Sequence, residues 1–298
     1  MEDILVINTF SQFNALRGYE VLHPLANVVD LSKSKPIQNA RLLTDTYSVA
    51  FKEGVCGELK YGNNYYDYSE GTLVFMAPGQ VIGINNDPDN FHPKGQGLFF
   101  HPDLLHGTSL GRTIKEYSFF SYASNEALHV SEREKQIILE GFKKIEFELR
   151  QSIDKHSKRL IVNNIELLLN YCMRFYDRQF ITRSDANKDI LVKFENLLDN
   201  YLKSELTQNL GLPTVKYCAD QLHLSPNYFG DLIKKETGKT PLDHIQLKLI
   251  ETAKERVFDT SKSISEIAYK LGFKSPQHFS RMFKNETGQT PNEYRSLN

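Results

Sequence analysis

"CADQLHLSPNYFGDLIKKETGKTP" (218–241) and "IAYKLGFKSPQHFSRMFKNETGQTP" (267–291) are two diverged copies of one segment. The second copy has a one-residue insertion, after which the two stay in register to their ends. The corresponding positions are Ala219 and Ala268, Leu222 and Leu271, Leu224 and Phe273, Pro226 and Pro276, Phe229 and Phe279, Lys234 and Lys284, Thr237-Gly238 and Thr287-Gly288, and Thr240-Pro241 and Thr290-Pro291. A segment given twice predicts one supersecondary unit built twice.

Helix boundaries are marked in the same way in both copies. Ser225-Pro226 and Ser275-Pro276 each offer an N-cap hydroxyl followed by proline at the first helical position, where its missing N–H costs nothing. Gly238 and Gly288 follow as C-terminal stops. A short helix, a tight turn and a second capped helix, given twice, predict a tandem helix-turn-helix. Such a unit can read two neighbouring stretches of DNA major groove.

A further helix is predicted to join the copies. It carries one apolar stripe, made of Leu242, Ile245, Leu249, Ala253 and Val257. A helix over 242–258 is about 25 Å long at 1.5 Å per residue. That is the scale needed to hold two recognition helices roughly 34 Å apart, one turn of DNA. At the tight turn, Gly272 is expected to supply a positive φ, and His223 takes the same place in the first copy.

The segment 188–298 resembles the DNA-binding domain of the AraC/XylS family of bacterial transcription regulators. The strongest stretch is "ISEIAYKLGF…SPQHFSRMFKNETGQTPNEYR", and its capping box pairs Ser263 with Glu266. The resemblance implies a DNA-binding domain over 190–298 with recognition helices at 226–236 and 276–286. Double-stranded DNA is therefore the expected partner.

The outward faces of these two helices supply the candidate DNA contacts. Arg281 has the fork geometry to read guanine and Gln277 to read adenine, each pair being worth roughly 1–3 kcal/mol of discrimination. Asp231 in the first copy is repelled by phosphate, so we expect the second copy to carry more of the base readout. The alternative is a merely solvated helix face. The candidates are Asn227, Tyr228, Asp231, Lys234, Lys235, Gln277, His278, Ser280, Arg281 and Lys284.

Charge and cysteine content limit which partners, cross-links and cellular locations the sequence allows. The chain of 298 residues has a net charge of −1. Residues 188–298 carry 16 lysines and arginines against 14 acidic residues, a charge of +2 that leaves −3 for the rest. Three separated cysteines without a CxxC pair argue against a disulfide framework or a structural zinc site. An acidic N-terminus and the lack of a long apolar run predict a soluble, cytoplasmic protein with no membrane segment.

Residues 131–180 are expected to form a helical hairpin. Ser131 with Glu134 fits a capping box, and two apolar runs at helical spacing flank the polar break "DKHSKR" (154–159). Such a hairpin resembles the dimerisation element of the family, and it also suits packing on its own N-terminal domain, so both roles stay open. The candidate dimerisation residues are Ile161, Ile165, Leu168, Leu169 and Cys172. Residues 181–189 are polar and predict a linker.

Residues 1–130 are predicted to be a small β-barrel. Short strands with turn punctuation, including "GLFF" and "YSFFSY", favour a jelly roll that resembles the cupin-like sensor domain of the family. The expected fold class is therefore multidomain α+β: a cupin-like barrel with a helical hairpin, followed by an all-α tandem helix-turn-helix domain. Candidate effector-binding residues are Tyr61, Tyr66, Tyr68, His101 and His106. The aromatic walls and polar tips of the tyrosines suit a small-molecule pocket, and they suit an ordinary half-buried sheet equally well.

Two enzymatic interpretations compete for the N-terminal domain. A metal-binding cupin needs a histidine pair followed by glutamate, and "PGQVIGINND" has Ile and Asn there. His101 and His106 around Asp103 more readily make turn and capping hydrogen bonds. "GTSLG" (107–111) matches the nucleophile-elbow expression, but a loop precedes Ser109 and a strand-like segment follows, which is the wrong context. We therefore expect no enzyme, no catalytic residues, no metal and no cofactor.

Taken together, these features predict a homodimeric, sequence-specific transcription regulator controlled by a small-molecule effector of unknown identity. Activation through RNA polymerase is what the family resemblance implies, and repression stays open. One alternative is a cupin-type metal-dependent enzyme with an accessory DNA-binding tail. Another is a ligand-independent regulator, which a closed, side-chain-filled barrel would favour.

Overall fold

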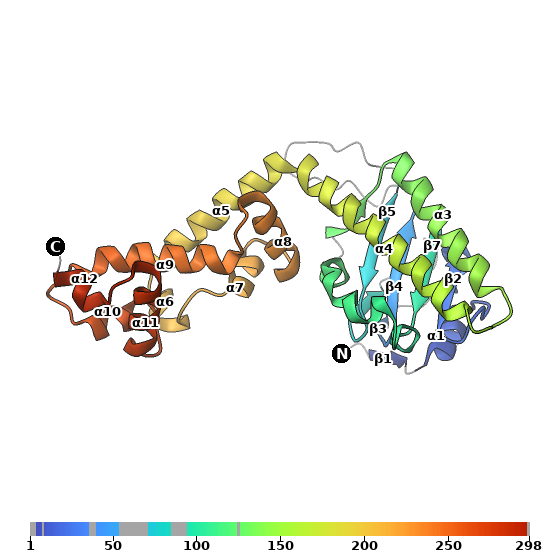
Figure 1. The fold of residues 1–298 in the computed structure, drawn as a ribbon, viewed down its shortest axis with the longest axis horizontal. Coiled ribbons are helices and arrows are strands. Elements are labelled where there is room, and N and C mark those ends of the chain that lie inside the picture. Colours follow the sequence, from blue (N-terminus) through green and yellow to red (C-terminus); the bar gives the residue numbers. More distant parts are fainter. Residues whose placement is uncertain are drawn as a thin grey trace. The chain divides into compact units, whose positions relative to one another are not determined.

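The chain divides into two units, residues 1–182 and 183–298 (Figure 1). The computed structural model describes residues 4–7, 9–35, 40–53, 71–84, 94–123 and 126–296. Among these residues, no helix has the length and apolar character required to cross a membrane. Tyr61, Tyr66 and Tyr68, three of the candidate effector-binding residues, lie outside the described residues.

The described strands of the first unit form two sheets (Figure 1). The smaller sheet has the order β1-β3-β6 and contains β1 (Ile4–Ile7), β3 (Ala40–Thr44) and β6 (Val81–Ile84). The larger sheet is antiparallel, with the order β2-β7-β4-β5-β8, and contains β2 (Ala26–Asp30), β7 (Gly95–Phe100), β4 (Tyr47–Lys52), β5 (Thr72–Met76) and β8 (Leu128–His129). The expected N-terminal sheet region is confirmed, and these strands do not close into a single barrel.

The larger sheet is buried on both faces. Because side chains alternate along a strand, Val49 and Phe51 of β4 lie on one face and Ala50 on the other. Ala50 joins a hydrophobic cluster that includes Phe13 of α1 (Phe10–Arg17) and Phe99 of β7. The Phe13 and Phe99 ring centroids are 4.7 Å apart. Aromatic side chains of α1 therefore fill the space beside this face of the sheet.

The segment after β7 folds into helical turns. These are the 3₁₀ turns η2 (Pro102–Leu105), η3 (Ile114–Glu116) and η4 (Ser118–Ser121), with the short helix α2 (Ser109–Thr113) among them. Our prediction of a strand at "YSFFSY" is therefore wrong. Aromatic residues favour strands only where a neighbouring strand is available. Here the Phe119 ring packs on Phe75 of the sheet at 4.4 Å and on Tyr176 at 5.4 Å between centroids.

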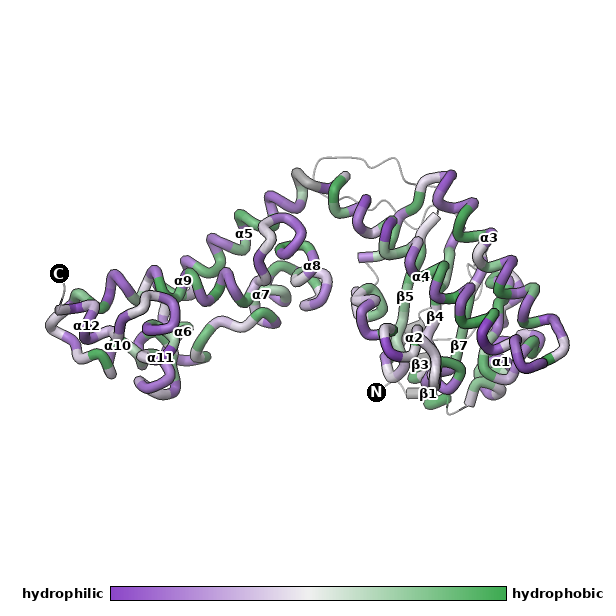
Figure 2. The backbone as a smooth tube through the Cα atoms, in the orientation of Figure 1, coloured by the Kyte–Doolittle hydropathy of each residue, from purple (hydrophilic) through white to green (hydrophobic). Residues whose placement is uncertain are grey.

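The predicted hairpin is present as α3 (Glu132–Leu149) and α4 (Ser157–Thr182), which lie across the larger sheet (Figure 1). The capping box of Ser131 and Glu134 is confirmed. Figure 2 shows hydrophobic and hydrophilic turns alternating along both helices, as expected for helices that bury one face. Arg178 of α4 ties the hairpin to β8, because its guanidinium donates to Glu134 at 2.9 Å and to the His129 carbonyl at 2.6 Å.

In its described residues, the second unit contains helices joined by turns and no strand. It contains α5 (Ser184–Lys203), α6 (Leu206–Leu210), α7 (Val215–Gln221), α8 (Pro226–Thr237), α9 (Pro241–Val257), α10 (Ile264–Lys270), α11 (Pro276–Thr287) and α12 (Pro291–Ser296). The expected linker, 181–189, is helical apart from Arg183, since α4 ends at Thr182 and α5 begins at Ser184. Polar residues of this segment contribute to packing, since Arg183 and Asn187 are buried and Asn187 donates to the Glu236 carboxylate at 2.9 Å.

Candidate nucleic-acid interface

Two helix-turn-helix motifs of matching construction lie in the second unit. In the first, α7 and α8 are joined by a turn, and in the second, α10 and α11 are joined in the same way. The predicted N-caps are present: the Ser225 and Ser275 hydroxyls accept from the N–H groups of Tyr228 and His278. Thr237 and Thr287 end the two recognition helices alike, each donating its hydroxyl to a carbonyl four residues earlier.

The tight turns have the backbone conformation that the sequence predicts. His223 has a φ of 57° and Gly272 a φ of 92°. In each turn the following residue closes back onto the first helix, because the N–H of Leu224 donates to the Ala219 carbonyl and that of Phe273 to the Ala268 carbonyl, both at 3.0 Å. The small side chains of Ala219 and Ala268 are fully buried, which allows the two helices of each motif to approach closely.

The helix α9 forms the core connection between the motifs. Its residues Ile245, Leu249, Ala253 and Val257 are buried as predicted, whereas Leu242 is exposed and does not belong to the stripe. Seventeen residues give α9 a length of about 25 Å. The predicted helix is therefore present, and its role in spacing the two recognition helices stays a prediction.

Contacts from α5 and α6 bind the two motifs into one unit. The Lys248 ammonium on α9 lies 2.7 Å from the Asp199 carboxylate on α5. Thr207 of α6 donates its hydroxyl to the Lys270 carbonyl, at the end of α10, at 2.9 Å. The Arg256 guanidinium donates to the Leu202 carbonyl at 2.6 Å. The first helix of the unit therefore contacts both motifs, directly or through α6.

The outward face of α11 agrees with the prediction. Phe279 and Phe283 are fully buried and Met282 packs beside their cluster. On the opposite side Gln277, His278, Arg281 and Lys284 are exposed, and Ser280 is half-buried. In the described part of the chain, no hydrogen bond or ion pair engages the side chains of Gln277 and Arg281, so both are available to a ligand.

The outward face of α8 is narrower than predicted. Asn227, Lys234 and Lys235 are exposed and Asp231 is half-buried, but only 4% of Tyr228 is exposed. Our placement of Tyr228 on the DNA-facing side is wrong. Tyr228 precedes the fully buried Leu232 by one helical turn and shares its face. The large phenol ring gains more from burial than from exposure.

The comparisons with known proteins concern this same region. A family model described as a helix-turn-helix domain matches residues 218–296. Residues 218–296 form an AraC-type helix-turn-helix domain. The match covers this part of the chain and not the N-terminal unit.

Relatives of the AraC-type domain carry regulator names. The "Uncharacterized HTH-type transcriptional regulator YobQ" of Bacillus subtilis is 32% identical over 75 residues, which are 25% of this chain and 30% of YobQ. The "Probable transcriptional regulator LumQ" of Photobacterium leiognathi is 24% identical over 115 residues, which are 39% of this chain and 42% of LumQ. The chain thus spans less than half of these relatives.

A solved structure is similar over the same region. The C-terminal domain of AraT, a response regulator from Geobacillus stearothermophilus, is 27% identical, with a TM-score of 0.33. The similarity covers 37% of this chain and 85% of that one.

Outside the AraC-type domain, the two candidate histidines do not line a common pocket in the described part of the chain. The His101 Nδ1 accepts from the Asp103 N–H and so caps η2, as the turn interpretation expected. The His106 side chain is 76% exposed, with Nδ1 3.6 Å from an Asp103 carboxylate oxygen. The placement of His106 in an effector pocket is therefore wrong, because its loop directs it to solvent.

Ser109 lies in a different context from the one the sequence suggested. A helix, α2, begins at Ser109 where we expected a strand-like segment, and a 3₁₀ turn precedes it. The Ser109 hydroxyl donates to a Glu166 carboxylate oxygen on α4 at 2.9 Å. A nucleophile elbow needs a strand directly before the serine. Ser109 instead helps to attach this segment to the hairpin.

The candidate dimerisation residues are all buried within the single chain. Ile161, Ile165, Leu168, Leu169 and Cys172 have at most 1% of their surface exposed. They form the side of α4 that packs on α3 and the rest of the first unit, so this choice of interface residues is wrong. The apolar periodicity identified the buried stripe of α4, which is the stripe that a partner subunit cannot reach.

Proposed function

We propose that the protein is a sequence-specific, DNA-binding transcription regulator. The observation that carries this proposal is the exposed face of α11, where the side chains of Gln277 and Arg281 have no partner among the described residues while Phe279 and Phe283 on the opposite face are buried. A helix held by its buried face and free on its polar face is what insertion into a major groove requires.

We propose different roles for the exposed residues of the two recognition helices. Arg281 suits bidentate contact with guanine and Gln277 with adenine, while Lys234 and Lys284 suit phosphate oxygens. His278, Ser280, Asn227 and Lys235 remain candidate contacts, and half-buried Asp231 suits a cytosine amino group better than a phosphate. Tyr228 contributes to the core of the first motif instead.

The test is selection of bound fragments from genomic DNA with the full-length protein, followed by affinity measurements on the enriched site. Replacing Arg281 by Ala is expected to cost roughly 1–3 kcal/mol of specific binding and to relax the preference at one base pair. Lys193→Ala removes a charge from an exposed position of α5, outside both recognition helices, and serves as the control. Equal effects of the two substitutions would contradict the assignment of α11 as a base-reading helix.

A homodimer is the oligomeric state that we propose, formed through a different face of α4 from the one first expected. Leu160 and Leu167 are 44% and 48% exposed and stand seven residues apart, two turns along one side of the helix. Tyr171 continues this seam at the following turn. Apolar side chains in such a row favour contact with a matching helix.

We propose that the first unit is a cupin-like sensor whose effector alters the affinity of the AraC-type domain for DNA. Two small sheets and a helical hairpin support this architecture, and population shift between two states would supply the control. Recruitment of RNA polymerase, and hence activation, is the expected output. The protein would act in the cytoplasm, where bacterial DNA lies.

One observation favours a second candidate, a ligand-independent regulator. The cluster beside the larger sheet is filled by Phe10, Phe13 and Tyr19 of the chain itself. A sheet domain whose interior is filled by its own side chains has no space there for an effector. Such a domain would serve only as a scaffold for dimers. Identical affinity for the enriched DNA with and without a cell extract as a source of effector would favour this candidate.

A further inference from the structure

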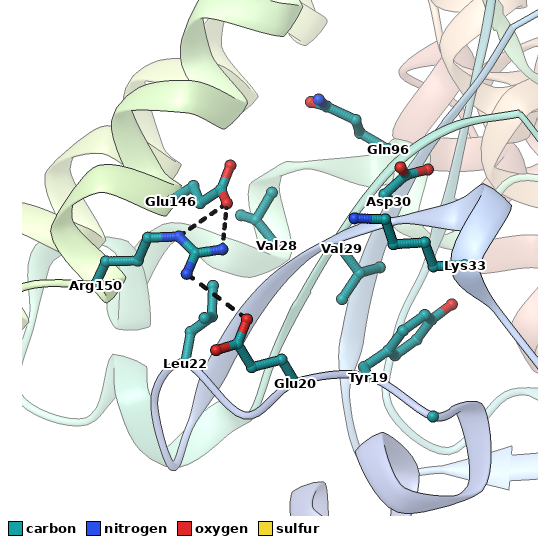
Figure 3. A pocket seen from close by; sticks show the side chains of 11 residues that line it. Tyr19, Glu20, Leu22, Val28, Val29, Asp30, Lys33, Gln96, Glu146 and Arg150 are labelled. Atoms are coloured by element: carbon teal, nitrogen blue, oxygen red, sulfur yellow. Dashed lines mark hydrogen bonds and ion pairs between the residues drawn. The ribbon is translucent and has the colours of Figure 1, made fainter.

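A hollow of about 160 Å³ lies at the edge of the larger sheet, between β2, the segment after α1 and the end of α3 (Figure 3). Its apolar floor includes Val28, Val29 and Tyr19. Charged side chains approach from three elements: Glu20 after α1, Asp30 and Lys33 around η1 (Leu31–Lys33), and Glu146 and Arg150 on α3. A hollow of this volume is large enough for several waters.

Arg150 is shared between two of the carboxylates, Glu146 and Glu20. The Arg150 guanidinium donates to the Glu146 carboxylate through Nε at 3.0 Å and Nη2 at 2.8 Å. Its remaining Nη1 lies 3.7 Å from the Glu20 carboxylate. Figure 3 shows this arginine between the two carboxylates, bridging α3 to the segment after α1. Arg150 therefore has little capacity left for an anionic ligand.

Three other polar groups of the hollow are not satisfied by the described protein. The Asp30 carboxylate accepts from the Ser32 N–H and hydroxyl through one oxygen only, which leaves the second oxygen available. The Ser32 hydroxyl hydrogen bond, with help from the Ser32 N–H and Lys33, holds the pKa of Asp30 below its ordinary value, so it is charged at neutral pH.

The other two groups are Gln96 and Lys33. The Gln96 Oε1 is buried without a hydrogen-bond donor among the described residues. A buried acceptor of this kind is costly unless a water or ligand satisfies it. The Lys33 ammonium reaches toward the hollow beside Asp30 and makes no ion pair within the described part of the chain (Figure 3).

We propose that this hollow binds a small zwitterion of the size of a free α-amino acid. Asp30 and the Gln96 Oε1 are acceptors for its ammonium group, and Lys33 is the cation for its carboxylate. A simple anion is disfavoured because three carboxylates line the hollow and Arg150 is already paired. A simple cation is disfavoured by the Lys33 ammonium, which lies beside Asp30 (Figure 3). Opposite charges on one short wall match a ligand that carries both.

The position of the hollow gives the ligand a route to the hairpin. Its walls belong to β2 and to α3, and α3 packs directly on α4. A ligand that contacts Asp30 and Lys33 occupies the space beside the Arg150 bridge and biases how α3 sits on the sheet. This regulatory consequence rests on the proposed function, whereas binding itself does not.

The experiment is a titration of the full-length protein with each of the twenty free L-amino acids at millimolar concentration, followed by calorimetry. We expect at least one to bind saturably, and Asp30→Asn and Lys33→Gln each to weaken that binding about tenfold or more. Asparagine still caps η1, so the first variant keeps the local structure. Lys143→Gln, on an exposed part of α3 outside the hollow, is the matched control and should bind as the wild type does.

Two results would overturn the proposal. One is that no amino acid binds, in which case water alone satisfies Gln96. The other is that the variants at 30 and 33 bind as tightly as the control. DNA affinity is measured separately with and without the bound amino acid, and an unchanged affinity refutes the regulatory role alone. A protein that binds no DNA would refute the proposed function while the titration still decides the ligand site.

Discussion

Gly272 lies against the backbone of Gly211, so that a Cβ on Gly272 would stand 2.7 Å from the Gly211 carbonyl carbon. The same Cβ would be 2.8 Å from the carbonyl oxygen of Thr207, whose hydroxyl holds the end of α10. Gly272 thus meets two requirements at once. It supplies the positive φ of the second helix-turn-helix turn, and it allows α6 to pack directly on that turn.

Gly272→Ala is expected to destabilise the second unit by about 3 kcal/mol or more. A positive φ alone costs a residue with a Cβ roughly 1–2 kcal/mol, and here backbone atoms that cannot rotate away add to it. Denaturant unfolding of the full-length protein, followed by helical circular dichroism, measures the change. Gly288→Ala is the control, because Gly288 also has a positive φ but a Cβ there meets nothing within 4 Å. Equal losses of unfolding free energy for both variants would show that the contact with α6 does not contribute to stability.

Gly230→Ala should have the opposite effect on stability. Gly230 lies inside α8 with a helical φ, and a Cβ there meets nothing within 4 Å. Alanine is more favourable than glycine in a helix by roughly 0.5–1 kcal/mol, so the unfolding midpoint should rise. If α8 enters a major groove by this face, the added methyl also weakens DNA binding. A stabilised variant with unchanged affinity would place Gly230 away from the DNA.

The capping boxes predict a loss of stability in acid. Hydrogen bonds from the backbone N–H and hydroxyl of Ser263 hold the pKa of Glu266 below its ordinary 4.5, and those of Thr290 do the same for Glu293. A carboxylate whose pKa is lower in the folded state stabilises the fold fully above its unfolded pKa. That contribution is lost as the pH falls through the lowered folded value.

Glu266→Gln tests this pH dependence. Glutamine keeps both hydrogen bonds of the box but does not titrate. The variant should unfold near the wild-type temperature at neutral pH and lose less stability than the wild type as the pH falls below 4.5. Thermal unfolding at a series of pH values measures the difference. Parallel curves for the two proteins would mean that the Glu266 cap is not formed in solution.

Substitutions at two neighbouring leucines of α4 distinguish the proposed dimer surface from the core of the hairpin. Leu167 is 48% exposed and Leu168 only 1%. Leu167→Glu should shift the protein from dimer to monomer in analytical ultracentrifugation and leave the monomer folded. Leu168→Ala should cost about 2–5 kcal/mol of stability, as buried leucine truncations do. A dimer that survives Leu167→Glu would exclude this face of α4.

Local signals in the sequence predicted the two helix-turn-helix motifs of the second unit, but not α5 or α6. The repeat, the Ser-Pro helix starts and the glycine stops predicted both motifs, and the positive φ at His223 and Gly272 followed from turn geometry. These features act within a few residues, so they can be read along the chain. The same kind of signal predicted the Ser131 capping box and the hairpin.

Features that depend on distant neighbours were decided only by the tertiary structure. Tyr228 is buried because it shares a face with Leu232 in the packed motif, and "YSFFSY" is helical because its rings pack between the sheet and α4. The hollow around Asp30 gathers side chains from β2, β7 and α3. The sequence by itself determined where helices start, turn and stop, since those choices are made by local hydrogen bonds. Which polar and apolar side chains meet was settled by folding, because burial and charge pairing depend on residues far apart in the chain.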